Sequence, residues 1–433
     1  MLDLFFGSHH ILYFNTNDME KTINFYRDFL GWPIYLSLEI PEKNQKLYIF
    51  SVSKDFSIGF YEWKSFFPLP AKSPGAPVSG NWSFDHLMIG VETEEDLWLL
   101  KDKCLMSGID VTDPVDHGFV YSIYFFDPNN ISLEFSYQTY NIRGLSMFLD
   151  PSPSSIAQEG AFPKESYWKE KYQKNHFDKK VLPRNFVKTF PESLKLKTQE
   201  ELNKDFTLHP YNSYYSQVKR DELFYSYQGS HILFFTTSNM DETIRFYRDL
   251  LGFQMNYSAG GPYNSFKMYM FNIDDLHSLA FFYWPTVKPP ARKVGGEPTY
   301  WWRWNYDSFS IGLSSVSKLW LLYEQLVNVG YSVSEVFDNG YSYSFEVFDP
   351  NNNCISFHAF TIDLSKEPLL LDKNPPPNGN SAFPQKGYWP DSLDPTPKGQ
   401  RKVLPGVGWD LIPPEMKNAE IKVDLTSSFD EEE

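Results

Sequence analysis

The stretch NDMEKTINFYRDFLGW, residues Asn17 to Trp32, recurs later in the chain as SNMDETIRFYRDLLGF, residues Ser238 to Phe253. Nine of the sixteen positions are identical, and the second stretch follows the first by 221 residues. Apolar side chains recur at helical spacing from Met19 to Leu30, and a glycine, Gly31, follows them. The sequence therefore predicts two equivalent helices in a duplicated chain.

The repeat extends well beyond this helix. The block Asp116-His117-Gly118 recurs as Asp338-Asn339-Gly340, and Phe126-Asp127-Pro128-Asn129-Asn130 recurs from Phe348 to Asn352, both 222 residues later. Two shorter blocks, Ala161-Phe162-Pro163 and Lys180-Val181-Leu182-Pro183, show that an extension after each module is duplicated too. We predict modules at residues 1–145 and 229–363, an extension with a linker at 146–228, and a matching extension with an acidic tail at 364–433.

Each copy has the pattern of an α+β protein, in which a strand, a helix and further strands occur twice over. Strands are predicted at 11–15, 46–51, 56–62, 85–91, 120–126 and 132–136 of the first copy. Asn17 with Glu20, and Thr93 with Asp96, have the spacing of capping boxes at the two helix starts. Because each copy contains the full order of elements, we expect residues 1–188 to fold by themselves.

Composition and charge exclude several classes of protein. The 433 residues are 42% hydrophobic and 18% aromatic, enough for packed cores in more than one domain. A formal net charge of −16 disfavours nucleic acid and anionic membrane as partners. No apolar run is long enough to span a bilayer, and the start of the chain does not resemble a signal peptide. The two cysteines, Cys104 and Cys354, are expected to be free thiols of a cytoplasmic protein.

Two motifs carry a resemblance to a known family. A strand that opens with histidine precedes the helix Phe-Tyr-Arg-Asp-x-Leu-Gly, and the run SIYFFDPNNISLEF at 122–135 closes the module. These motifs resemble the vicinal oxygen chelate superfamily, which includes glyoxalases, bleomycin-resistance proteins and extradiol dioxygenases. The resemblance covers about Gly7 to Tyr140 and Gly229 to Ile362. It implies tandem modules, each of two paired βαβββ units whose curled mixed sheets surround a cavity.

The resemblance also implies a metal site in the first copy. The family takes its metal ligands from the first strand of each unit and from the last strand, and these positions are His10, His86 and Glu134 here. Two imidazoles and a carboxylate form the facial triad of non-heme iron oxygenases. We therefore expect a divalent metal, Fe(II) before Mn or Zn. His9 competes with His10, but the repeat register favours His10.

The second copy does not keep this set of residues. His231 matches His10, whereas Ser308 and Ser356 stand at the positions of His86 and Glu134. His358 lies two residues after Ser356 and so on the same face of the strand, which leaves a shifted ligand open. The favoured interpretation is that this copy has lost its metal, and that it supports the first copy or binds something without one.

Two further residues are candidates for catalysis. His117 could act as a general acid or base near the metal, although Asp-His-Gly also has the composition of a turn. Tyr124 shares a face with Glu134 if the turn between their strands preserves parity, and it could hydrogen-bond a substrate or be a core aromatic. Gly59 and Tyr61, at the position of a fourth ligand in glyoxalases, are poor ligands, which favours the dioxygenase arrangement.

We therefore expect a metal-dependent enzyme, foremost an extradiol-type dioxygenase that acts on a catechol-like aromatic with O₂. The alternatives are another metal enzyme of the superfamily, of glyoxalase, lyase or isomerase type, and a metal-free binding protein of the bleomycin-resistance type. The sequence does not fix the substrate, the metal or the oligomeric state, nor whether the second copy binds a ligand. The aromatic cluster Tyr300 to Trp304 also stays without an assigned role.

Overall fold

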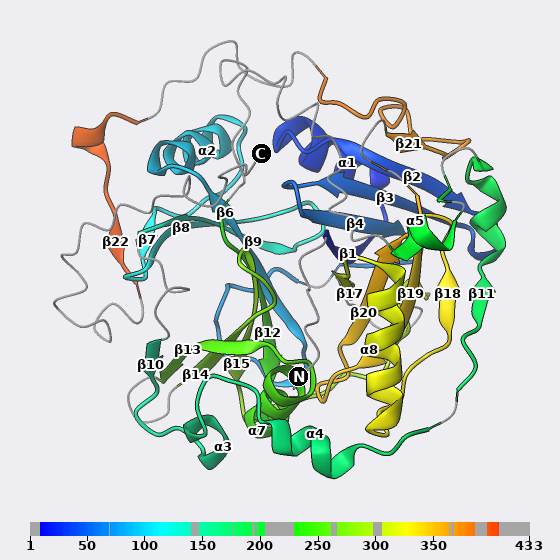
Figure 1. Ribbon diagram of the computed structural model, residues 1–433. Helices are drawn as coiled ribbons and strands as arrows, with labels where there is room; N and C mark the ends of the chain where they lie inside the picture. Colours follow the sequence, from blue (N-terminus) through cyan, green and yellow to red (C-terminus); the bar gives the residue numbers. More distant parts are fainter. Residues whose placement is uncertain are drawn as a thin grey trace, which may run out of the picture.

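The computed structural model describes most of the chain (Figure 1). The described residues are 9–68, 70–139, 147–175, 177–192, 195–196, 198–203, 229–260, 266–297, 305–362, 364, 368–385 and 396–406. No helix among them is long and apolar enough to cross a membrane. Cys104 and Cys354 are both buried and free, as expected from the sequence.

Four βαβββ units follow one another along the chain, two in each copy. The first contains β1 (His10–Thr16), α1 (Met19–Ile23) with its π-helical continuation η1 (Asn24–Phe29), β2 (Ile34–Ile40), β3 (Gln45–Ser51) and β4 (Phe56–Glu62). The second contains β6 (Phe84–Val91), α2 (Glu94–Met106), β7 (Val115–Asp116), β8 (Val120–Phe126) and β9 (Ser132–Gln138).

The second copy repeats this order. The third unit contains β12 (His231–Thr237), α7 (Met240–Ile244) with η6 (Arg245–Leu250), β13 (Gln254–Gly260), β14 (Lys267–Asn272) and β15 (His277–Tyr283). The fourth contains β17 (Tyr306–Gly312), α8 (Val316–Asn328), β18 (Val336–Asp338), β19 (Ser342–Phe348) and β20 (Cys354–Phe360).

Shorter elements lie between and after the units. In the first copy they are η2 (Pro41–Lys43), β5 (Gly80–Asn81), β10 (Met147–Leu149), α3 (Ser155–Gln158), α4 (Glu165–Lys171), β11 (Val181–Pro183), η3 (Asn185–Thr189) and α5 (Gln199–Asn203). In the second copy they are β16 (Val287–Lys288), β21 (Leu369–Leu370), η8 (Lys398–Gln400) and β22 (Leu404–Pro405).

Most strands of the described residues form two ten-stranded mixed sheets, each of which combines units from both copies, while β5 and β16 pair in a separate two-stranded sheet. Sheet one has the order β11-β18-β19-β20-β17-β1-β4-β3-β2-β21, and sheet two has the order β10-β13-β14-β15-β12-β6-β9-β8-β7-β22. At the centre of each sheet a first strand of one copy runs antiparallel to a strand of the other, β1 beside β17 and β12 beside β6. In Figure 1 the blue first unit accordingly lies beside the yellow and orange fourth unit.

The α+β class and the four curled βαβββ units agree with the resemblance, but the pairing of the units differs from the expected one. The first unit pairs with the fourth and the second with the third, so neither sheet belongs to a single copy. The extensions cross over as well. Strands β10 and β11 of the first copy pair with β13 and β18, while β21 and β22 of the second copy pair with β2 and β7.

The helix that reveals the repeat begins one residue later than predicted. The side chain of Asp18 accepts a hydrogen bond from Lys21 N–H and is the N-cap, whereas the Asn17 amide donates to Phe66 O. Gly31 ends the helical segment with a φ of 84°. The second predicted box is confirmed, because Thr93 and Asp96 exchange hydrogen bonds between side chain and backbone.

Alternation along the strands gives each sheet two different faces. On β1, Leu12 and Phe14 belong to the main core, which is shared by both sheets and their helices. Ile11 and Tyr13 point to the opposite face and belong to a smaller cluster within sheet one. On β12 of sheet two, Phe234 likewise belongs to a smaller cluster on the face away from the main core. These second faces are where the cavities lie.

Candidate functional site

His86 and Glu134 lie side by side on neighbouring strands of sheet two. Strand β6 runs parallel to β9, and the register places Glu134 beside Met88, two residues from His86. The His86 Nε2 atom is 2.8 Å from Glu134 Oε2, and the His86 Nδ1 atom is 2.6 Å from Asp85 Oδ1. All three side chains are buried. The structure therefore brings together two of the three residues that were predicted as metal ligands.

Tyr124 and His117 continue this hydrogen-bonded chain. Tyr124 on β8 is the direct partner of Glu134 on β9, so the two side chains share a face, as the sequence suggested. The Tyr124 hydroxyl donates to Glu134 Oε1 over 3.0 Å and lies 2.8 Å from His117 Nε2. Since the hydroxyl proton is used toward Glu134, the His117 Nε2–H is the donor of the second bond.

Burial and hydrogen bonding set the charges of this chain. Burial opposes ionisation of Glu134, but the hydrogen bond and charge of His86 outweigh it and lower the Glu134 pKa to about 2. Burial also disfavours the charged form of His86, yet hydrogen bonds to Asp85 and Glu134 raise its pKa above the usual value. Burial and the neighbouring carboxylate hold the Tyr124 pKa well above its usual range. The site thus combines a carboxylate with a neutral phenol, and its hydrogen bonds favour the protonated form of His86.

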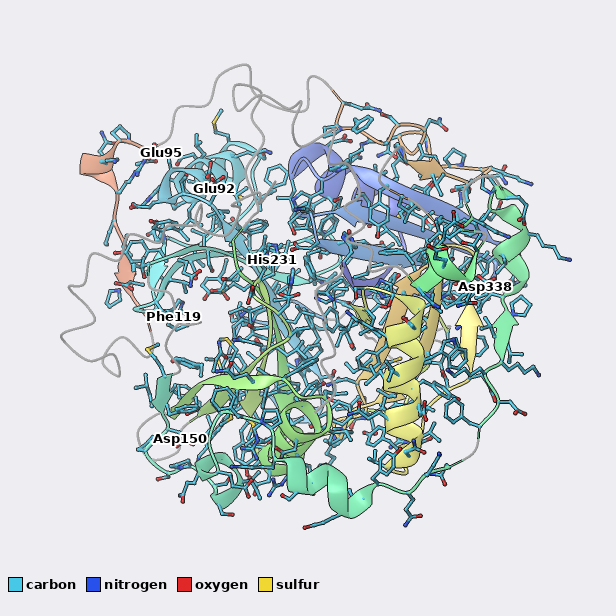
Figure 2. The ribbon with its side chains drawn as sticks, viewed as in Figure 1. Glu92, Glu95, Phe119, Asp150, His231 and Asp338 are labelled. Carbon is cyan, nitrogen blue, oxygen red and sulfur yellow. The ribbon has the colours of Figure 1, made fainter. Side chains whose placement is uncertain are left out.

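The hydrogen-bonded chain forms one end of a cavity of about 370 Å³. The other walls are mostly apolar and come from both copies; they include Phe119, Phe234, Tyr257, Met268, Phe282 and Trp284. The ring of Phe234 stacks on the His86 imidazole with 4.0 Å between the ring centroids. Figure 2 labels Phe119, which belongs to the part of this wall contributed by the first copy.

His10, the third predicted ligand, does not join this site. Its strand belongs to sheet one, and alternation puts its side chain on the face of Leu12 and Phe14, away from the cavity face. The register of β12 with β6 places Phe234 directly opposite His86. The facial triad expected from the sequence is therefore not assembled. His10 lies in the other sheet, its side chain points to the core face, and the strand beside His86 comes from the second copy.

His10 instead belongs to a buried cluster between the sheets. Its Nε2 atom is 2.7 Å from Asp274 Oδ2, and the His277 Nδ1 atom is 2.8 Å from Asp274 Oδ1. These three residues are the group of described histidines, cysteines and carboxylates whose ligand atoms lie close enough to hold a metal ion. The sequence interpretation missed them. The available signal was a difference between the copies, because Ser53 and Phe56 stand at the positions of Asp274 and His277.

The hydrogen bonds of His10 do not suit metal binding. Gly312 N–H donates to His10 Nδ1, so this nitrogen is unprotonated and Nε2 carries the proton that is donated to Asp274. A metal ligand would need Nε2 unprotonated. His231 has the same arrangement, with Gly90 N–H donating to Nδ1 and Ser53 Oγ beside Nε2. In Figure 2, His231 lies near the middle of the molecule, consistent with a structural role at the junction of the sheets.

The donors in sheet two fit a divalent metal only in part. Asp85 orients His86 in the way that carboxylates orient metal-ligating histidines. Glu134 supplies a second ligand atom, but the residues facing this pair from β12 and β15 are Phe234 and Phe282. Among the described residues no third histidine, cysteine or carboxylate completes a metal site around His86 and Glu134.

In sheet one, Ser308 and Ser356 line a smaller cavity together with His358. The His358 Nδ1 atom is 2.7 Å from Ser310 Oγ, and within the described part of the chain His358 belongs to no group of three potential metal ligands. A shifted metal site in the second copy therefore gains no support. The aromatic cluster at 300–304 lies outside the described residues.

Comparison with known proteins finds one matching family. The family model of the glyoxalase/bleomycin resistance protein/dioxygenase superfamily matches residues 7–135 and 230–357. No curated protein matches the chain.

Three solved structures illustrate the similarity. A candidate dioxygenase from Bacillus subtilis strain 168 shares 11% identity with a TM-score of 0.48, over 82% of this chain and 86% of its own. Glyoxalase I from Zea mays shares 12% identity with a TM-score of 0.45, over 81% and 91%. A glyoxalase family protein from Enterococcus faecalis shares 21% identity with a TM-score of 0.25, over 31% and 99%. With the family model matched in both copies, the chain belongs to the glyoxalase/bleomycin resistance protein/dioxygenase superfamily.

Proposed function

We propose that the sheet-two cavity binds a flat, largely apolar organic molecule whose hydroxyl group reaches the end formed by His86, Glu134 and Tyr124. The observation that carries this proposal is the composition of the cavity wall. A space of about 370 Å³ is surrounded by aromatic and aliphatic side chains and carries hydrogen-bonding groups at one end. This combination is typical of small-molecule sites, in which apolar walls supply affinity and a few polar groups fix orientation.

The polar end can orient such a ligand and can exchange a proton with it. Glu134 is held as a carboxylate by hydrogen bonds from Tyr124, Ser136 and His86. His117, which lines the cavity beside Tyr124, is the group that we propose as general acid or base, as expected from the sequence. Binding in this form relies on the chain's own residues and requires no resident metal ion.

A second candidate is the metal-dependent dioxygenase that the sequence favoured. The observation in its favour is the contact between Asp85 and His86, which leaves His86 Nε2 directed at Glu134 Oε2. These two residues would be the protein ligands of Fe(II), or of Mn or Zn, and the metal would supply joint binding of a catechol-like substrate and O₂. The donor set lacks the third residue of the triad, so this candidate ranks second.

The binding proposal is tested with 1-naphthol and naphthalene, which differ by one hydroxyl, on the full chain freed of metal with EDTA. Calorimetry should show tighter binding of 1-naphthol. Tyr124→Phe should reduce this preference by about 3- to 10-fold, the usual value of one hydrogen bond. The control is Tyr121→Phe on the same strand, because alternation points residue 121 to the opposite face.

The two candidates make different demands on metal. Binding of 1-naphthol that is equal before and after EDTA treatment supports the first candidate. One bound metal per chain together with O₂ consumption on addition of catechol would favour the second. Equal affinity of 1-naphthol and naphthalene, unchanged in Tyr124→Phe, would contradict the assigned role of the polar end.

A further inference from the structure

Sheet one contains a cavity of its own, with a chemistry unlike that of sheet two. The space of about 60 Å³ is lined by side chains of both copies and of an extension. Since one water requires roughly 10–15 Å³ of such space, the cavity has room for about four to six waters or a molecule with a similar number of heavy atoms. Its polar lining includes Tyr13, Tyr61, Arg184, Asn339, Ser344 and Glu346.

This cavity is not a weakened copy of the sheet-two site. By the repeat, Ser308 and Ser356 replace His86 and Glu134. Glu346 stands where sheet two has Tyr124, so a carboxylate enters the cavity from the middle of β19. A cation comes from outside the four units, because Arg184 follows β11, the extension strand that pairs with β18 of the other copy.

The carboxylate of Glu346 is buried with an unused acceptor. The residue is only 8% exposed, and its Oε2 atom has no hydrogen-bond partner among the described residues. Its Oε1 atom is 3.9 Å from an Arg184 guanidinium nitrogen, which is longer than a hydrogen bond. Burial raises the Glu346 pKa to about 7 despite the charge of Arg184. A buried carboxylate without donors is rare unless a ligand or water supplies them.

Arg184 is held so that its guanidinium can meet an anion. The guanidinium carbon lies 4.2 Å from the ring centroid of Phe337, and the Arg184 backbone N–H donates to Asp338 O. Stacking of one face leaves the in-plane N–H groups for an acceptor, and a planar guanidinium matches a carboxylate with two parallel hydrogen bonds. The cavity therefore presents donors at Arg184 and an acceptor at Glu346, a short distance apart.

We propose that the sheet-one cavity binds a small carboxylate that also carries a hydroxyl or amine, with the carboxylate on Arg184 and the donor group on Glu346. Molecules with two or three carbon atoms match the space. The neighbouring hydroxyls of Tyr13 and Tyr341, 3.1 Å apart, and the Ser344 hydroxyl can complete the hydrogen bonds of the bound molecule.

The experiment uses the full chain and isothermal calorimetry at pH 7 with four probes: glycolate, lactate, glycine and alanine. Acetate and propionate carry the carboxylate without a donor group, and ethylene glycol carries the hydroxyls alone. At least one of the four probes should bind at least about tenfold more tightly than the comparators, since both charged groups are then satisfied. Binding by glycolate and lactate identifies a hydroxyl at Glu346, and binding by glycine and alanine identifies an amine.

Two arginine variants separate binding from stability. Arg184→Met should reduce the affinity for the probe that binds by at least about tenfold. Its matched control is Arg292→Met, because Arg292 also lies over a phenylalanine ring, that of Phe348, but does not line the cavity. Thermal unfolding verifies that both variants are folded.

If Arg184→Met does not fold, Glu346→Gln gives the second test, because it should remove the preference over acetate. The proposal is overturned if none of the four probes binds more tightly than acetate. It is also overturned if the folded Arg184 variant binds the probe as tightly as the Arg292 variant.

Discussion

At the residue scale, the stability of the sheet-two site depends on the Glu134 carboxylate and the protonated form of His86, because each stabilises the charge of the other. The Glu134 pKa is lowered from 4.5 to about 2, so its contribution to stability is present above pH 4.5 and is lost as the pH falls toward 2. The His86 pKa is raised above 6.5, so its contribution is complete below pH 6.5 and is lost as the pH rises through the raised value. Both contribute between about pH 4.5 and 6.5.

We therefore predict that Glu134→Gln lowers the free energy of unfolding by about 1–3 kcal/mol at pH 5.5 and by less at pH 9. Urea unfolding of EDTA-treated protein at the two pH values measures the difference. Glu200→Gln, an exposed residue of α5, is the control and should change little at either pH. A difference that is the same at pH 5.5 and pH 9 would mean that the two groups are not linked by charge.

A second residue-scale prediction concerns the contact between strands at Gly90. A Cβ atom there would overlap the backbone of Gly229 and Ser230, and Gly312 is equally crowded against His9 in the other sheet. Gly90→Ala should therefore cost about 1–3 kcal/mol, as expected for overpacking. Gly399→Ala, where a Cβ meets nothing within 4 Å, should stay within about 0.5 kcal/mol. Thermal unfolding measures the stability of the two variants. Equal stability would contradict the close approach of Gly90 to the backbone of Gly229 and Ser230.

The candidate site could be predicted from sequence as far as one copy determines it. His86, Glu134 and Tyr124 belong to strands of the same unit, so period-two alternation and the family motif place them together. His10 could not be placed in the same way. The strand that pairs with β1 at the centre of the sheet is β17, which comes from the other copy. Phe234, which lies opposite His86 in the cavity, has no chemical signature that marks it as a site residue.

At the element scale, the helices and strands could be predicted from the local sequence pattern. The structural role of the repeated Phe-Tyr-Arg-Asp motif could not. Arg248 is fully buried and pairs with its neighbour Asp249. Its guanidinium also donates to Ile156 O and Gly160 O, in the extension of the other copy. Arg27 does the same with Asn378 O and Ser381 O. The motif that reveals the fold therefore also attaches the crossing extensions, a partnership that no local pattern contains.

We predict that Arg248→Met destabilises the protein by about 3–5 kcal/mol, because it leaves the Asp249 carboxylate buried without its main partner. The midpoint of urea unfolding measures the effect. Lys195→Met is the comparison, since the ion pair of the half-buried Lys195 with the exposed Glu192 should contribute less than about 1 kcal/mol. Similar midpoints for the two variants would indicate that the buried arginine does not hold the extension.

At the scale of the whole molecule, the chain is a pseudo-dimer in which each sheet needs both copies. Sequence repeats cannot reveal this arrangement, because the first unit has equivalent surfaces to offer to the second unit or to the fourth. The extensions take part in this choice, because β10, β11, β21 and β22 each pair with a strand of the other copy. The interleaving has a functional consequence. Both cavities are built from both copies, but Ser308 and Ser356 both line the sheet-one cavity, so the sheet-two cavity keeps His86 and Glu134.

This arrangement changes the outcome expected for separated halves. In residues 1–188 alone, β1 lacks β17 and β6 lacks β12, so the central edges of both sheets are exposed. Exposed edges of this kind pair with another chain. We therefore predict that the fragment 1–188 associates with itself or unfolds, and that it is not a compact monomer.

Adding residues 229–433 as a separate chain should give a one-to-one complex that unfolds cooperatively, as the intact protein does. Light scattering coupled to size exclusion, followed by thermal unfolding, measures both properties. A chain cleaved within 204–228 is the matched control, because its halves fold together before the cut. A stable monomer of 1–188 that unfolds cooperatively and does not bind the second half would show that the units can pair within one copy, as the repeat alone suggests.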